Sequence, residues 1–189
     1  TGYDDRHTSI EGFGHFHEFQ IGGLVFMPTV GDVKTVPGTL ENPDEGYRSR
    51  FDKSTEKAEP GYYKVELKDY EIKAELTATE RIGYHRYTFP ETTAANIVID
   101  IGHKQGESSD VTQAVAQFVN ENEVEGYIET YPEYVKFCDP GKRVRMYFMA
   151  KFSKNPMGHL SFVDEDLKEN AIKTEGINNG LVLTFSMDQ

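Results

Sequence analysis

The sequence predicts an all-β protein, an antiparallel β-sandwich with long loops and at most short helices. The first observation is composition: 11 Tyr, 12 Phe, 17 Gly and 8 Pro in 189 residues favour strands joined by turns over long helices. The second is that apolar and polar residues alternate in many short segments, with turn residues between them. The length suffices for one sizeable core but is short for two, so we expect a single domain over residues 1–189.

Alternation with a period of two identifies most of the expected strands. It is clearest in RVRMYFMAKF, residues 143–152, where Val144, Met146 and Phe148 share one face. Strands are also expected, in chain order, at 22–28, 62–67, 71–79, 84–89, 96–101, 125–131 and 180–187.

The expected strand at 84–89 has two chemically different faces. His85, Tyr87 and Phe89 alternate with Arg86 and Thr88, so one set faces a core and the other faces solvent or a neighbouring domain.

Other segments are less regular. DVTQAVAQFV, residues 110–119, fits both a helical stripe and a strand, and periodicity leaves the choice open. A short helical turn is expected at Asp164–Ala171, where Asp164 is a suitable cap. The longest loops are expected at Val36–Lys57 and His103–Asp110, which are rich in turn residues.

Charge and cysteine content exclude several classes of protein. The formal net charge of −12 repels a phosphate backbone, so nucleic acid is not an expected partner. The single Cys138 cannot form an internal disulfide. No run of about 18 apolar residues predicts a membrane span, and no signal peptide is recognisable. Because the chain opens on Thr1, we expect a fragment cut from something larger.

Two histidines in GFGHFHEFQIGG, residues 12–23, are the first candidates for a site. In an extended chain His15 and His17 point to the same side and could share a metal or a ligand hydroxyl. Alternatively, they hydrogen-bond within a loop or pack beside neighbouring phenylalanines. A metal site would need further ligands, for which the nearby candidates are Asp4, Asp5, His7 and Glu18.

Motifs for other chemistry are missing from the sequence. It holds no Gly-x-Ser-x-Gly elbow and no phosphate-cradling glycine loop. Acids are abundant, but abundance alone identifies no catalytic pair.

Several longer motifs, taken in order, resemble the N-terminal domain of glycoside hydrolase family 92, the calcium-dependent exo-acting α-mannosidases, including α-1,2-mannosidases. The most specific are YRSRFDKSTEKAEPGYYKVEL at 47–67 and ELTATERIGYHRYTFP at 75–90. GFGHFHEF, FMPTVG, NIVIDIGH, VEGYIE and VRMYFMAKFSK extend the resemblance over nearly the whole chain.

The resemblance implies a β-sandwich that packs on a separate (α/α)₆ catalytic domain of the same polypeptide, with the active site where the two meet. It implies inverting hydrolysis of α-mannoside glycans, in which one acid protonates the leaving oxygen and a carboxylate activates water. In the family, those carboxylates and the calcium ligands belong to the helical domain. This chain is therefore expected to carry no catalytic residue, no metal ligand and no cofactor. A secreted, periplasmic or cell-surface location is also implied.

The histidine stretch resembles the family pattern Gly-Phe-Ser-His-Thr-His, which lies towards the domain interface. His15 and His17 match it, so the resemblance implies that both line the sugar-binding cleft. Two alternatives stay open: a free-standing carbohydrate-binding or interaction module, and a metal-dependent enzyme centred on these two histidines. The matching residues are Gly12, Phe13, His15 and His17, whereas Gly14, Phe16 and residues 18–20 depart from the family pattern.

Overall fold

The computed structural model describes residues 6–15, 22–92, 94–104 and 109–186. Nearly all regular structure in these ranges is antiparallel β-sheet, which confirms the predicted fold class. The one α-helix of the described residues is α1, Glu133–Cys138, and two 3₁₀ turns, η1 at Pro43–Glu45 and η2 at Lys53–Thr55, interrupt a long loop.

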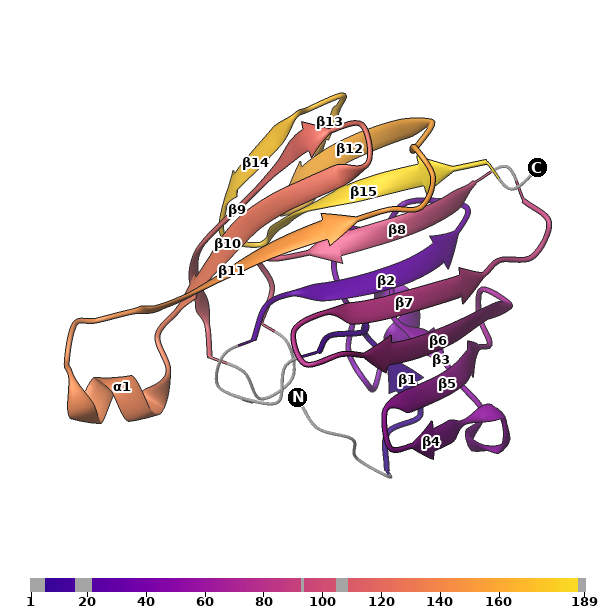
Figure 1. Cartoon of the computed structure of the whole chain (residues 1–189), viewed down its shortest axis with the longest axis horizontal. Coiled ribbons are helices and arrows are strands. Elements are labelled where there is room, and N and C mark those ends of the chain that lie inside the picture. The colour runs from indigo at the N-terminus through magenta and orange to yellow at the C-terminus, as the bar shows by residue number, and fades with distance from the viewer. Residues whose placement is uncertain (1–5, 16–21, 93, 105–108, 187–189) are drawn as a thin grey trace.

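The strands form three larger sheets and one two-stranded ribbon (Figure 1). The five-stranded sheet has the order β13 (Asp166–Glu169), β12 (Gly158–Val163), β15 (Asn179–Phe185), β8 (Ala95–Asp100) and β2 (Val25–Val30). One four-stranded sheet has the order β11 (Val144–Lys151), β10 (Glu123–Thr130), β9 (Val111–Asn120) and β14 (Lys173–Gly176). The other runs β4 (Lys57–Glu59), β5 (Tyr62–Leu67), β6 (Ile72–Ala78) and β7 (Gly83–Thr88), and the ribbon pairs β1 (Ser9–Ile10) with β3 (Ser49–Arg50).

Strand β8 is buried along its whole length, because the five-stranded sheet is covered on both faces. Successive side chains of a strand point to opposite faces. Ile97 and Ile99 accordingly join one hydrophobic cluster, and Val98 between them joins the other. The five-stranded sheet is thus the middle layer of the molecule (Figure 1).

Each outer sheet supplies the other half of one cluster. Residues of β9 and β10, such as Ala114 and Ile128, complete the first cluster, and residues of β5 and β6, such as Val65 and Ile72, complete the second. The expected sandwich is therefore present, with a third sheet packed on its second face. Alternation within single strands carries no information about which sheets stack, so this layer was not predicted.

The ambiguous segment is a strand, since β9 pairs with β10 on one side and with β14 on the other. The helical turn expected at Asp164–Ala171 is wrong. Asp164 instead has a left-handed backbone with φ of 53°, and its N–H donates to the Asn178 carbonyl at 2.8 Å. Strand β13 follows directly and pairs with β12, so backbone pairing overrides the weak local helical preference.

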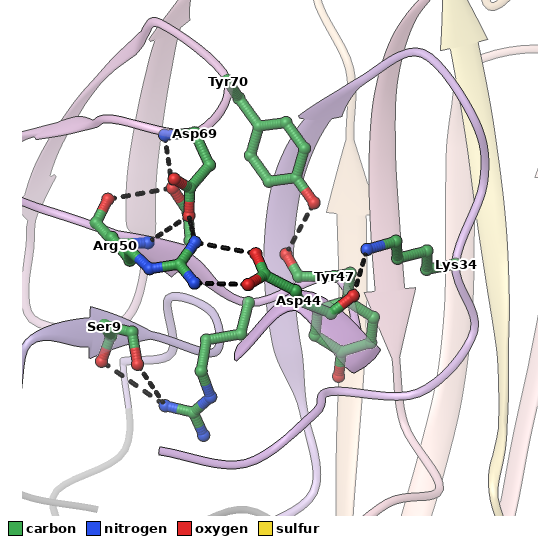
Figure 2. A network of polar contacts seen from close by, with 9 residues as sticks. Ser9, Lys34, Asp44, Tyr47, Arg50, Asp69 and Tyr70 are labelled. Atoms are coloured by element: carbon green, nitrogen blue, oxygen red, sulfur yellow. Dashed lines mark hydrogen bonds and ion pairs between the residues drawn. The ribbon is translucent and has the colours of Figure 1, made fainter. Parts of the chain in front are cut away.

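The loop expected at Val36–Lys57 is held in place by polar contacts. The Arg50 guanidinium donates to both oxygens of Asp44 at 2.8 and 2.5 Å and to Asp69 at 3.2 Å (Figure 2). The Tyr70 hydroxyl donates to the Tyr47 carbonyl at 3.1 Å in the same network. These contacts give a segment with little regular structure a defined path.

The buried Asp100 ties this loop to the middle sheet. Its Oδ2 accepts from the Tyr47 hydroxyl and is 2.6 Å from His103 Nδ1. Its Oδ1 accepts from the backbone N–H groups of Gly102 and His103 at 3.0 Å each. Such a fully hydrogen-bonded carboxyl group stabilises a strand end. These hydrogen bonds account for the complete burial of Asp100, which is 0% exposed, and no catalytic role is needed to explain it.

We expect Ile99→Ala to lower the free energy of unfolding by about 2–5 kcal/mol, because it opens a cavity in the first cluster. Urea unfolding measures this change. The matched control is Ile172→Ala, whose side chain is 72% exposed and which should change stability by no more than about 0.5 kcal/mol. Equal losses in the two variants would contradict the central place of β8.

Candidate functional site

An open depression lies beside the N-terminal segment. Its volume is about 920 Å³, and residues 6–15, 22–25 and strands β4, β5 and β6 contribute to its walls. His15 lines it, together with the charged side chains Glu11 and Arg48 and the aromatic side chains Tyr62 and Tyr63. His17 lies outside the described residues, as do Asp4, Asp5 and Glu18, so the pairing of His15 with His17 stays a prediction.

Phe13 positions the histidine segment. Its ring is buried in the second cluster, and its backbone exchanges hydrogen bonds of 2.9 and 3.0 Å with Phe26 at the start of β2. Gly12 permits this close approach: its φ is 156°, and a Cβ there would lie 2.7 Å from the Val25 Cβ. Two residues beyond this anchor, the chain carries His15 onto β7.

His15 is hydrogen-bonded to a second histidine, on β7. The Nε2 atoms of His15 and His85 are 2.7 Å apart, and His85 Nδ1 is 2.5 Å from the Tyr87 hydroxyl. The Phe26 ring meets His85 edge-on, at 5.4 Å between centroids. The prediction that His85 and Tyr87 share a face was correct, but sequence reasoning missed their contact with His15, 70 residues away.

The three hydrogen-bonded side chains, His15, His85 and Tyr87, are all neutral near pH 7. Burial, reinforced by the proximity of His15, lowers the pKa of His85 to about 4. Partial burial lowers the pKa of His15, and burial raises the pKa of the Tyr87 phenol well above its usual value. The contacts are therefore hydrogen bonds between uncharged groups.

Glu11 and Arg48 form an ion pair on the wall of the depression. Arg48 Nη2 donates to Glu11 Oε2 at 2.5 Å, and Nη1 reaches the carbonyl and hydroxyl oxygens of Ser9 at 3.4 Å. Burial raises the pKa of Glu11 despite the opposing effect of the Arg48 charge. Both side chains contribute to the lining of the depression.

The motif at 47–67 ends in strand β5, which brings two tyrosines, Tyr62 and Tyr63, to the same depression. The Tyr62 hydroxyl donates to Glu75 at 2.8 Å and the Tyr63 hydroxyl to Glu56 at 2.6 Å. Aromatic faces with fixed polar edges are suited to sugar rings, which are apolar on their faces and polar at their rims.

No metal cluster is evident in the described part of the chain, where no group of three or more His, Cys, Asp or Glu is arranged to hold an ion. The described residues also contain no helix long and apolar enough to span a membrane. The single Cys138 is exposed on α1, away from the depression.

The stacked antiparallel sheets and the open depression define a β domain of the kind found within larger glycoside hydrolases. The structure is similar to that of a family 92 α-mannosidase from Bacteroides thetaiotaomicron, solved in complex with mannoimidazole, with a TM-score of 0.85 and 31% identity over 98% of this chain. The family 92 glycosyl hydrolase ccman5 matches with a TM-score of 0.75 and 25% identity, also over 98% of the chain. A family 92 inverting mannosidase from Bacteroides thetaiotaomicron shares the fold, with a TM-score of 0.72 and 18% identity.

The family description "Glycosyl hydrolase family 92 N-terminal domain" matches residues 1–189, and the chain belongs to this family as its N-terminal domain. The resemblance seen in the sequence is thereby confirmed. The chain spans 25%, 25% and 23% of the three solved enzymes. No protein with a curated description matches the sequence.

The lowered pKa of His85 makes stability depend on pH. The unfolded chain takes up a proton near the ordinary pKa of 6.5, whereas the folded protein resists protonation until about 4. The stabilisation that depends on neutral His85 is therefore complete above pH 6.5 and is lost as the pH falls towards 4. When the pH is lowered from about 7 to 4, we expect the free energy of unfolding of the parent chain to fall by about 2–3 kcal/mol more than that of the His85→Gln variant. Urea unfolding at both pH values checks this, and identical losses would contradict it.

Proposed function

We propose that this chain is the non-catalytic N-terminal domain of an α-1,2-mannosidase, which packs on a helical catalytic domain and lines the sugar-binding cleft. The observation that carries the proposal is that His15 is anchored on the wall of an open depression, beside Glu11 and Arg48. Family membership and the quarter-length coverage of solved α-mannosidases support it. We also propose a secreted, periplasmic or cell-surface location.

The proposed division of labour follows from the chemistry of inverting hydrolysis. The reaction needs an acid and a base on opposite faces of the sugar, with room for water between them. We assign both carboxylates and the calcium ion to the rest of the polypeptide. The domain contributes hydrogen bonds that orient hydroxyl groups and a wall that excludes water.

A hairpin between β10 and β11 supplies a second contact with the rest of the enzyme. It carries α1 and projects away from the sheets (Figure 1). No residue of α1 is buried, and the Phe137 side chain is 86% exposed. Charged side chains of the hairpin pair with each other, as Lys142 does with Asp139 at 2.8 Å. The Phe137 ring is the most exposed large apolar side chain of α1 and is available to contact another domain. We propose that this hairpin packs on the catalytic domain.

The first test uses the chain alone and joined to the remainder of its polypeptide. The isolated chain should release no mannose from α-mannosides, and the complete enzyme should release it in a calcium-dependent reaction. Turnover by the chain alone would overturn the proposed division of labour. Saturable binding of an α-mannoside by the chain alone would instead support a free-standing binding module.

Within the complete enzyme, His15→Ala should lower kcat/KM for an α-mannoside by about tenfold, the worth of one good hydrogen bond. His17→Ala is expected to act in the same direction. The control is His159→Ala on β12, which lies outside the depression and should leave kcat/KM unchanged. Thermal unfolding verifies that all three variants are folded. Unchanged kinetics in His15→Ala would remove this residue from the cleft.

Substitution of the hairpin tests the proposed packing. Phe137→Ser should weaken the association of this chain with a separately produced catalytic domain by about tenfold or more, because a large apolar side chain is lost from the contact. Ile172→Ser, at a comparably exposed position on another edge, is the matched control. Titration calorimetry measures both, and equal affinities would contradict a role for the hairpin.

A further inference from the structure

We propose that Tyr87 and His85 are positioning residues that hold His15 in one tautomer, with its proton on Nδ1. In that state His15 presents an N–H donor to the depression. The proposal rests on the proposed function for its ligand, an uncharged sugar oxygen, but the assignment of protons rests on the geometry of the three side chains and on their neutral state.

The Tyr87 hydroxyl sets the donor-to-acceptor direction of the hydrogen bonds that link it through His85 to His15. It is a neutral, partly buried donor, and among the described residues its hydrogen-bond partner is His85 Nδ1, at 2.5 Å. A partly buried O–H group is expected to donate to an available acceptor. His85 Nδ1 therefore accepts, and it carries no proton.

A neutral imidazole carries one proton on its two nitrogens, so the proton of His85 lies on Nε2. That atom is 2.7 Å from His15 Nε2 and donates to it. His15 Nε2 is then the acceptor, and the single proton of His15 must lie on Nδ1. The reversed order of hydrogen bonds would leave the partly buried Tyr87 hydroxyl without an acceptor among the described residues, which is unfavourable.

Gly83 determines how the His15 ring is seated. A Cβ at position 83 would lie 2.2 Å from Cδ2 and 2.5 Å from Nε2 of His15, so this edge of the ring rests on the backbone of β7. The edge that carries Nδ1 is the opposite one. His15 is exposed and lines the depression, and no hydrogen bond from another described residue occupies its Nδ1 edge.

The chemical consequence is a donor of fixed identity. A His15 Nδ1–H group recognises an oxygen acceptor, such as a hydroxyl or ring oxygen of a pyranose. The opposite tautomer would present a lone pair and would require the ligand to donate. The partly buried Tyr87 thus determines, through His85, which ligand atoms the exposed His15 binds.

Nitrogen NMR of the 189-residue chain tests the inference directly, because ¹⁵N shifts distinguish protonated from unprotonated ring nitrogens. Near pH 7, His15 should be protonated at Nδ1 and His85 at Nε2. Observation of His15 protonated at Nε2 would overturn the proposal, with no variant required.

Tyr87→Phe removes the hydroxyl that sets the direction and should shift the tautomer ratio of His15 towards the Nε2–H form by about tenfold. The matched control is Tyr70→Phe. It removes a hydroxyl that donates to the Tyr47 carbonyl, takes no part in the hydrogen bonds between Tyr87, His85 and His15, and should leave the ratio unchanged. A ratio that does not respond to Tyr87→Phe would remove Tyr87 from its positioning role.

Gly83→Ala tests the seat of the ring if the tyrosine variant does not fold. The new methyl group should displace His15 and change its ¹⁵N shifts. Gly158→Ala, where an added Cβ meets nothing within 4 Å, should not. Unaltered His15 shifts in Gly83→Ala would contradict the seating.

These readouts separate the inference from the proposed function. With the predicted tautomer present and responsive, normal turnover of α-mannosides by a His15→Ala enzyme would reject the sugar contact and leave the positioning intact. The opposite tautomer in the parent chain would reject the positioning whatever the enzyme does.

Discussion

Burial of β8 on both faces is the constraint on which the rest of the structure depends. A strand in the middle layer must present apolar side chains in both directions, and Ile97, Val98 and Ile99 do so. One outer sheet then closes each cluster, and a shift of one residue in register would exchange the two faces. Asp100, at the end of the same strand, anchors the long loop through Tyr47.

The candidate site is a consequence of this layering. Phe13 joins the second cluster and pairs with Phe26 of β2, so the N-terminal segment is held against the middle sheet. That anchor brings His15 onto β7, where His85 and Tyr87 turn inward. The hydrogen-bonding properties of an exposed residue are in this way tied to the core.

The site's chemistry is that of recognition. Its hydrogen-bonded side chains, His15, His85 and Tyr87, are uncharged near pH 7. The charges of its ion pair, Arg48 with Glu11, offset each other. A surface of neutral donors and acceptors beside tyrosines suits uncharged polyols, as the proposed function requires. The exposed hairpin around α1 fits the proposed packing on a catalytic domain, since the Phe137 side chain is 86% exposed.

Period-two alternation by itself determined the fold class and most of the larger strands, although it left β9 open and missed β12, because strand geometry puts a direct signature into the sequence. The motifs likewise determined the family. The alternation at 84–89 also placed His85 and Tyr87 on the same face of their strand. Only the tertiary structure decided that 110–119 is a strand, that Asp164 begins a hairpin turn, and that a third sheet covers the middle one. It also decided that His15 meets His85. These features depend on contacts between residues far apart in the chain, and local periodicity carries no record of such contacts.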